Sequence, residues 1–125
     1  MPNTADRQTL GKQGESLACR ALAERGYAIV ATRFRTRFGE IDIVARHGRT
    51  IVFIEVKARR SNRAGDAAEA VSSYKRRRIA AMALDYLAWT SALDQPCRFD
   101  VVAIDGIGTE RMHVRVIEDA FQVDS

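Results

Sequence analysis

The sequence predicts an α/β fold in which a mixed central sheet is flanked by helices, with elements in the order α-β-β-β-α-β-β. Two segments carry apolar side chains at the spacing of one helix face. Five shorter segments are rich in β-branched residues and lie between turn-forming residues. The second helix falls between the third and fourth strands, which permits a parallel crossover there, and the first three strands are expected to form an antiparallel meander.

The first half of the chain supplies one helix and three strands. The helix is expected from about Thr4 to Arg25, because Thr4 or Asp6 can cap its start and Gly26 can end it. A turn near Gly48-Arg49 is expected to join the last two strands. The three strands are expected over residues 27–35, 39–47 and 50–58.

The second half begins with a polar loop over residues 59–66 and continues with a helix and two strands. The helix is expected to begin near Ala67 or Ser72 and to end at Trp89. The strands are expected over residues 98–104 and 113–117, joined through Gly106 and Gly108.

Length and composition predict a single globular domain over residues 1–125. The chain is 46% hydrophobic and 29% charged, which is typical of a folded protein rather than a disordered one. No apolar run approaches the roughly 20 residues of a membrane span, and the N-terminus lacks the apolar core of a signal peptide. We therefore expect a cytoplasmic protein with no membrane partner. The net charge of +4 permits an anionic partner without proving one.

Two charged residues lie in one of the most apolar runs of the chain. Glu55 and Lys57 belong to the expected strand over residues 50–58, and alternate side chains of a strand share a face. Charged side chains are rarely fully buried unless they are paired or bind a metal. Their position in this strand therefore needs an explanation.

Asp42 is expected to lie opposite this pair on the preceding strand. A hairpin loop of two or four residues gives Asp42 the same face as Glu55, and closure at Gly48-Arg49 places the two directly opposite each other. A loop of three residues would reverse this parity. Two such close carboxylates repel unless a proton or cation lies between them, and oxygen ligands of this type suit Mg²⁺ or Mn²⁺.

Both expected helices carry a charged residue next to an apolar row. Glu15 is spaced with small and apolar residues of the first helix, so we expect it to project inward. Lys75 lines up with Ile79 and Met82 on the second helix, although that stripe is less clean. Arg76 and Arg77 are expected to turn toward solvent.

Each of these residues also has an ordinary structural interpretation. Glu55 and Lys57 are compatible with a surface ion pair, and Asp42 with a turn cap. Glu15 is compatible with the edge of a helix face, and Lys75 with a stem laid along the core. Five charged residues on apolar faces, three of them in one hairpin, favour a functional site over five separate accidents.

The remaining polar residues are less specific. Arginines cluster before and after the expected hairpin, and these are candidates for positioning a nucleic-acid backbone, although an ordinary solvated face explains them equally well. The candidates are Arg35, Arg37, Arg59 and Arg60. His47, His113, Cys19 and Cys97 are isolated in the sequence and are assigned no chemistry.

Several segments together resemble the PD-(D/E)xK nuclease superfamily, and within it the YraN family of uncharacterised bacterial proteins, which is similar to archaeal Holliday-junction resolvases. The matching segments are 14–18, 39–44, 52–59, 70–71 with Lys75 after them, and 98–102. They span nearly the whole chain and are more specific than Glu-Xaa-Lys alone. The sequence departs from the family at Arg33, where the family often has asparagine.

The resemblance implies a restriction-endonuclease-like fold and a Mg²⁺- or Mn²⁺-dependent endonuclease that hydrolyses phosphodiester bonds in nucleic acid, with DNA, and branched DNA in particular, as its substrate. In that hypothesis Asp42 and Glu55 hold the metal, and Lys57 orients or activates water. Glu15 positions water or metal, and Lys75 contacts the phosphate or steadies the carboxylates. Analogy with the resolvases suggests a homodimer. The alternatives are a non-catalytic nucleic-acid-binding module on the same fold, and a structural protein in which Glu55 and Lys57 form a buried ion pair.

Overall fold

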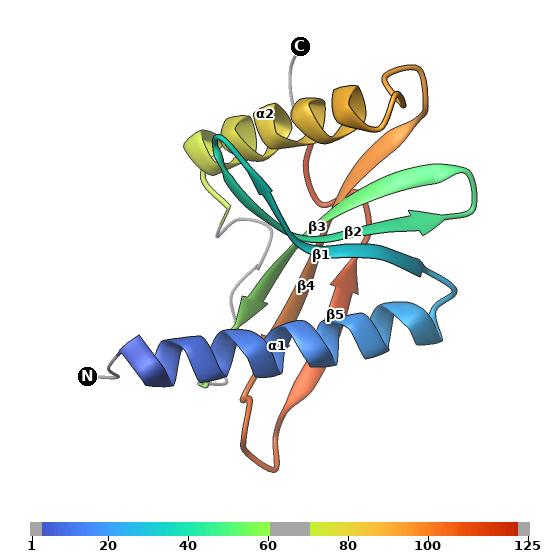
Figure 1. Ribbon diagram of the computed structural model, residues 1–125. Helices are drawn as coiled ribbons and strands as arrows, with labels where there is room; N and C mark the ends of the chain where they lie inside the picture. Colours follow the sequence, from blue (N-terminus) through green and yellow to red (C-terminus); the bar gives the residue numbers. More distant parts are fainter. Residues whose placement is uncertain (1–3, 61–70, 123–125) are drawn as a thin grey trace.

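The computed structural model of the chain describes residues 4–60 and 71–122, with the backbone alone for residues 4–9. One sheet lies between two helices that cover its opposite faces (Figure 1). The predicted order α-β-β-β-α-β-β is confirmed. The helices are α1 (Thr4–Glu24) and α2 (Ser73–Trp89), and the strands are β1 (Ala28–Thr36), β2 (Gly39–His47), β3 (Thr50–Ala58), β4 (Cys97–Asp105) and β5 (His113–Ile117).

The five strands form one mixed sheet in the order β1-β2-β3-β4-β5. The first three strands form the predicted antiparallel meander, and β3 pairs with β4 in parallel after the crossover through α2. His47 pairs with Thr50, so the turn between β2 and β3 has two residues, as closure at Gly48-Arg49 requires. Strand β1 lies at one edge of the sheet and β5 at the other.

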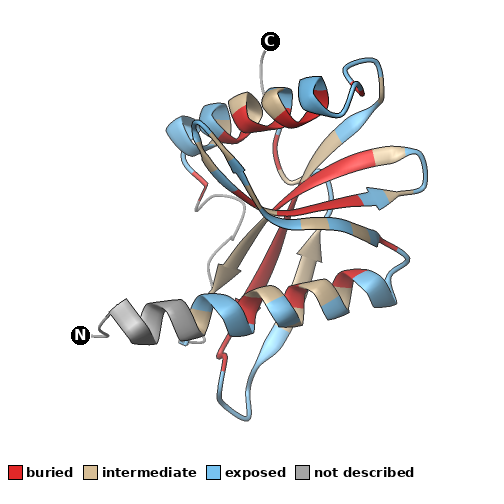
Figure 2. Ribbon diagram, in the orientation of Figure 1, coloured by how far each residue is buried: buried red, intermediate tan, exposed pale blue. Residues whose placement is uncertain are grey.

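Each face of the sheet has its own hydrophobic core (Figure 2). Phe53 and Val101 point toward α2, where they pack with buried residues of that helix such as Met82. Ile54 and Val102 of the same two strands point to the other face, toward buried residues of α1. The alternation along β3 and β4 therefore buries apolar side chains on both faces of the sheet.

The helix ends follow from local chemistry. Gly26 adopts a φ of +88°, a conformation that glycine tolerates well, just after α1 ends. The Ser72 side chain accepts a hydrogen bond from the backbone N–H of Lys75 at 3.2 Å and caps α2, which confirms the predicted start near Ser72. The alternative start at Ala67 and most of the predicted polar loop, residues 61–66, lie outside the described residues, as do the side chains of Thr4 and Asp6.

Arg76 corrects one expectation about α2. Its Nε donates to the carbonyl of Val71 at 3.0 Å, and its guanidinium lies 5.3 Å from the ring centroid of Phe121. The side chain therefore covers a core aromatic residue of the C-terminal segment instead of turning to solvent. Arg77 is exposed, as predicted.

A buried polar cluster lies where β1 and β4 begin and β2 ends. It includes His47, for which the sequence indicated no partner. Asp100 is fully buried and accepts hydrogen bonds from Tyr27 at 2.7 Å and from Arg98 at 2.9 Å. Arg98 also contacts Nδ1 of His47 at 3.0 Å, and the His47 ring stacks on Tyr27. The backbone N–H of Asp119 donates to Asp100 at 2.9 Å. The cluster therefore links the start of β1, the end of β2, β4 and the C-terminal segment.

Of the helices in the part of the chain that the structure describes, none is both long enough and apolar enough to cross a membrane.

Candidate active site

Asp42 and Glu55 come from neighbouring strands at a point where those strands separate. The printed register of β2 and β3 runs from His47 opposite Thr50 to Ile43 opposite Ile54. One further step of the same register would place Asp42 opposite Glu55, which is the position that the two-residue turn predicts. Strand pairing ends before this step, so the site lies where the two strands begin to diverge.

The alternation of β2 breaks at Asp42. In a regular strand Ile41 and Ile43 would share a face, yet Ile41 packs in the core under α2 and Ile43 in the core over α1. The Asp42 side chain spans the gap between the strands, where its Oδ2 accepts a hydrogen bond from the backbone N–H of Val56 at 2.8 Å. The predicted pairing of Asp42 with Glu55 is therefore present, but the regular parity used to predict a shared face does not hold at this residue.

Asp42 holds a proton more strongly than an ordinary aspartic acid. Burial, followed by the negative charge of Glu55, raises its pKa to about 7, and the Val56 N–H and the Lys57 charge offset only part of this rise. The two carboxyl groups are close enough for a hydrogen bond between them, which stabilises a shared proton. Crowded acids of this kind are typical of sites that accept a cation.

Lys57 and Lys75 bring positive charge to the same carboxylates. The Nζ atom of Lys57 lies 3.4 Å from Oε1 of Glu55, with both side chains largely buried. A hydrogen bond to Lys57 and repulsion from its charge lower the pKa of Lys75, and burial adds to this effect. The apolar stripe predicted beside Lys75 is confirmed by buried Ile79 and Met82, while Lys75 itself is exposed.

Two adjoining pockets surround these residues. We call the first the carboxylate pocket; its volume is about 410 Å³, and Glu15, Arg33, Asp42 and Lys57 contribute its charged lining together with Glu40. We call the second the lysine pocket; its volume is about 290 Å³. The lining of the lysine pocket comprises Glu40, Asp42, Glu55, Lys75, Arg78, Ile79 and Met82. Asp42 and Glu40 line both pockets, whereas Glu55 lines the lysine pocket alone.

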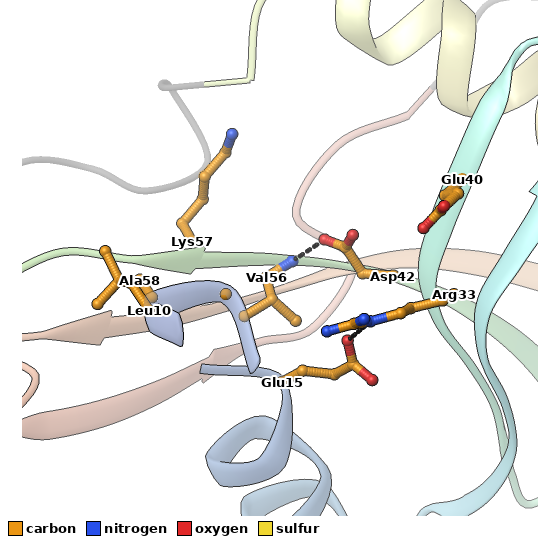
Figure 3. A pocket seen from close by; sticks show the side chains of 9 residues that line it. Leu10, Glu15, Arg33, Glu40, Asp42, Val56, Lys57 and Ala58 are labelled. Carbon is orange, nitrogen blue, oxygen red and sulfur yellow. Dashed lines mark hydrogen bonds and ion pairs between the residues drawn. The ribbon is translucent and has the colours of Figure 1, made fainter. Parts of the chain in front are cut away.

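Glu15 enters the carboxylate pocket from α1. A Cβ atom on Gly14 would come within 2.9 Å of the Cβ of Ala58, so only glycine allows α1 to approach the end of β3 this closely. Figure 3 shows Glu15 reaching the pocket from one side of β3 while Lys57 extends from the other. The Glu15 side chain points inward, as predicted, but it lines the pocket instead of entering the core. It lies at the edge of the apolar row, in which Ala18 and Leu22 are fully buried.

Arg33 was not among the predicted site residues, yet it lines this pocket. Its Nε donates to Oε2 of Glu15 at 2.6 Å, and its backbone has a φ of +51°. That conformation is uncommon for a residue with a side chain and is often found at functional sites. The sequence signal was the departure from the family's asparagine at this position.

None of the four predicted backbone-binding arginines lines the carboxylate pocket or the lysine pocket. Arg35 pairs with Glu40 at 3.1 Å, and Arg37 pairs with Asp85 at 3.3 Å. Arg59 is half-buried, and its backbone bonds to Ile104 and Ile107. Arg60 is exposed at the end of a described segment.

The carboxylate set fits a hard divalent cation with few protein ligands. Within residues 4–60 and 71–122, no group of three or more His, Cys, Asp or Glu side chains is arranged to hold a metal. Mg²⁺, however, is usually bound by one or two carboxylates, with water and substrate phosphate filling the other positions. Asp42 and Glu55 supply that number, and the pKa of Asp42 is raised first by its burial and then by the nearby negative charge of Glu55.

Comparison with other proteins identifies the family. The model of the uncharacterised protein family UPF0102 matches residues 14–104. The chain belongs to the UPF0102 family. A UPF0102 protein of Geotalea uraniireducens (strain Rf4) is 46% identical over 119 residues, which cover 95% of this chain and 94% of the relative. A UPF0102 protein of Symbiobacterium thermophilum is 44% identical over 112 residues, covering 90% and 95%.

Membership of UPF0102 confirms the resemblance to the YraN family. The matched range includes all five residues predicted for catalysis, from Glu15 to Lys75, and the relatives align along nearly their whole length. A UPF0102 protein of Nocardia farcinica is 45% identical over 104 residues, which cover 83% of this chain and 82% of the relative. The arrangement around Asp42 therefore belongs to the part of the chain that defines this family.

Proposed function

We propose that the protein is a metal-dependent nuclease that hydrolyses phosphodiester bonds in nucleic acid, with DNA, including branched DNA, as the first substrate to test. The observation that carries this proposal is the juxtaposition of Asp42 and Glu55, two acids close enough to share a proton. Lys57 lies 3.4 Å from Glu55 and adds a basic side chain to the two acids. Asp42 and Lys57 line the carboxylate pocket, and Asp42 and Glu55 line the lysine pocket. This set of two acids and a lysine is also the arrangement that the PD-(D/E)xK resemblance implies.

The metal ligands in this proposal are Asp42 and Glu55. A divalent cation held by them would supply polarisation of a phosphoryl oxygen and a more acidic water. The Val56 N–H fixes one oxygen of Asp42, which leaves its other oxygen directed at the pocket that it lines. This backbone contact holds the ligand in place before any cation arrives.

The lysines act on the phosphate. Lys57 stabilises the negative charge that develops as a water oxygen attacks phosphorus and the bond to the leaving oxygen breaks. Lys75 lines the lysine pocket and lies within hydrogen-bond reach of Lys57, so in this proposal both lysines act on the same phosphate group. Glu15 orients the attacking water from the opposite side of β3, and Arg33 holds Glu15 in that position.

A second function is supported by the ion pairs of the site. Glu55 is paired with Lys57, and Glu15 with Arg33, so much of the local charge is already balanced. With a net charge of +4, the same fold is compatible with a nucleic-acid-binding module that does not cleave. A binding module of this kind should bind nucleic acid in a salt-sensitive way, and this binding should persist when Asp42 and Glu55 are substituted.

The test is a cleavage assay on end-labelled branched, single-stranded and duplex DNA, and on RNA, with Mg²⁺ or Mn²⁺. We expect cleavage by the wild type, and losses of about 100-fold or more in Asp42→Asn, Glu55→Gln and Lys57→Ala. Asp94→Asn, an exposed acid in the loop after α2, is the matched control and should cleave like the wild type. Equal residual activity in the wild type and all three site variants would sink the nuclease proposal, and salt-sensitive binding by those variants would then favour the binding module.

A further inference from the structure

A further pocket, separate from the carboxylate and lysine pockets, lies at the edge of the sheet that β1 forms. Its volume is about 410 Å³, and its lining comprises Phe34, Arg35, Thr36, Asp85 and Trp89; we call it the aromatic pocket. Trp89, the sole tryptophan of the chain, is 75% exposed at the last residue of α2. Its ring centroid lies 5.5 Å from that of Phe34, with the planes tilted by 47°. Much of the indole is therefore free to contact a ligand.

The floor of this pocket is rigid. Phe34 packs edge-on against Tyr86, whose ring in turn packs edge-on against Phe53 in the core. An aromatic platform anchored in this way loses little conformational entropy when a ligand stacks on it. The pocket thus offers an ordered aromatic surface beside an exposed indole.

Positive charge borders the pocket. The side chains of Arg35 and Arg37 are 82% and 75% exposed, and they form surface ion pairs with Glu40 and Asp85, respectively. Such exposed pairs contribute little in water, so the guanidinium groups can exchange their carboxylate partners for phosphate oxygens. The guanidinium of Arg37 also lies 4.9 Å from the ring centroid of Phe38. A ligand with planar rings and an anionic backbone matches both features.

The aromatic pocket is connected to the candidate active site through the β1–β2 hairpin. Arg35 lines the aromatic pocket and pairs with Glu40, and Glu40 lines both the carboxylate pocket and the lysine pocket. Arg35 and Glu40 therefore place the aromatic pocket and the two pockets of the candidate active site on the same hairpin.

We propose that the aromatic pocket is a nucleobase-stacking subsite, which takes an unpaired base of a single-stranded segment next to the bond to be cut. This inference rests on the proposed action on nucleic acid, and it deepens it by naming the substrate class. Bases within a duplex are stacked on each other and cannot reach the indole without leaving the helix, whereas bases of a single strand can. The substrate would thus carry unpaired bases beside the cleavage position.

The sole tryptophan allows a direct test without catalysis. Tryptophan fluorescence is measured in EDTA, with excitation where tyrosine does not absorb, during titration with a thymidine oligomer, an abasic oligomer of equal length and a blunt duplex. We expect quenching by the thymidine oligomer, and little by the abasic oligomer or the duplex. Equal quenching by the abasic oligomer, or no quenching by the thymidine oligomer, would overturn the subsite.

Binding of labelled oligomers to variants supplies the second measurement. Trp89→Ala should weaken binding of the thymidine oligomer by about fivefold or more without changing binding of the abasic oligomer, and Trp89→Phe should retain most of the affinity. Leu84→Ala, which removes an exposed apolar side chain of α2 outside the pocket, is the matched control and should bind like the wild type. Equal affinity of Trp89→Ala and Leu84→Ala for the thymidine oligomer would contradict the proposal.

The outcomes separate this inference from the nuclease proposal. Metal-dependent cleavage without quenching means that the protein is a nuclease and the subsite is wrong. Quenching that depends on bases, in a protein that cleaves nothing, supports the subsite and defeats the nuclease proposal. Concentration-dependent burial of Trp89 in sedimentation and fluorescence measurements without nucleic acid would assign the surface to a second copy of the chain, and would overturn the subsite.

Discussion

The carboxylate of Asp42 accepts a hydrogen bond from the backbone N–H of Val56 across the gap where β2 and β3 separate, at 2.8 Å. This contact replaces a strand-to-strand hydrogen bond with a side-chain bond at the point where regular pairing ends. It fixes one oxygen of the acid and satisfies a backbone donor that the diverging strand leaves open. The candidate metal ligand Asp42 is therefore also the residue that connects β2 to β3 where their pairing ends.

Removal of this acceptor is expected to destabilise the protein. Asp42→Ala leaves the Val56 N–H without its acceptor and should lower the free energy of unfolding by about 1–2 kcal/mol relative to Asp42→Asn, whose amide oxygen can still accept the bond. Urea denaturation of the two variants measures the difference. Equal stability would show that the bond to Val56 does not hold the junction.

The raised pKa of Asp42 predicts a pH-dependent stability in the absence of metal. Because the folded protein holds this proton up to about pH 7 and the unfolded chain only to its ordinary, lower pKa of 3.8, the folded state is favoured by protonation. The stabilisation is complete below the unfolded pKa and is lost as the pH rises through about 7. Asp42→Asn removes this titration.

The measurement is denaturation of the wild type and Asp42→Asn in EDTA at about pH 5 and about pH 8. Between these pH values the wild type should lose on the order of 1–3 kcal/mol of stability relative to the variant, because the comparison cancels the other titrating groups. Parallel changes in the two proteins would contradict a raised pKa at Asp42.

The backbone of Arg33 predicts an unusual order of stabilities. Its φ of +51° suits glycine better than alanine, so Arg33→Gly should be more stable than Arg33→Ala by about 1 kcal/mol, although both lose the bond to Glu15. Thermal or urea denaturation of the two variants measures this directly. A more stable Arg33→Ala would mean that this residue does not hold a left-handed conformation in solution.

The buried cluster around Asp100 predicts a large structural effect away from the site. Arg98→Met leaves the fully buried Asp100 without its paired charge and should destabilise the protein by about 3–5 kcal/mol. Arg46→Met, which removes an exposed arginine bonded to Gln95, is the control and should change stability by less than about 1 kcal/mol. Denaturant unfolding compares them, and similar small effects would show that the Asp100 pair contributes little.

Local sequence signals predicted the elements well because each has its own physical cause. Ser72 could be recognised as a cap, Gly26 as a helix end, and Gly48-Arg49 as a two-residue turn. The turn then fixed the register of β2 and β3 as far as Ile43 opposite Ile54, one residue short of Asp42 and Glu55. The cap, the helix end and the turn each depend on residues close together in the sequence. Hydrophobic periodicity and turn-forming residues are therefore enough to predict them.

Features that depend on bending and on distant contacts were not predictable in this way. The break in alternation at Asp42 arises where β2 leaves β3, and a regular two-residue period cannot show it. Arg76 covers Phe121 only because the C-terminal segment returns to α2. His47 looked isolated because its partners, Tyr27 and Arg98, are far away in the sequence.

The proposed nuclease function depends above all on whether Asp42 and Glu55 together hold a divalent cation, and calorimetric titration with Mn²⁺ tests this most directly. At about pH 6, where Asp42 holds its proton, the wild type should bind Mn²⁺ with release of protons, seen as a heat that changes with the ionisation enthalpy of the buffer. Asp42→Asn and Glu55→Gln should lose this binding, while Asp94→Asn keeps it. Equal Mn²⁺ binding by the wild type and both site variants, or no binding by the wild type, would contradict a metal site formed by Asp42 and Glu55.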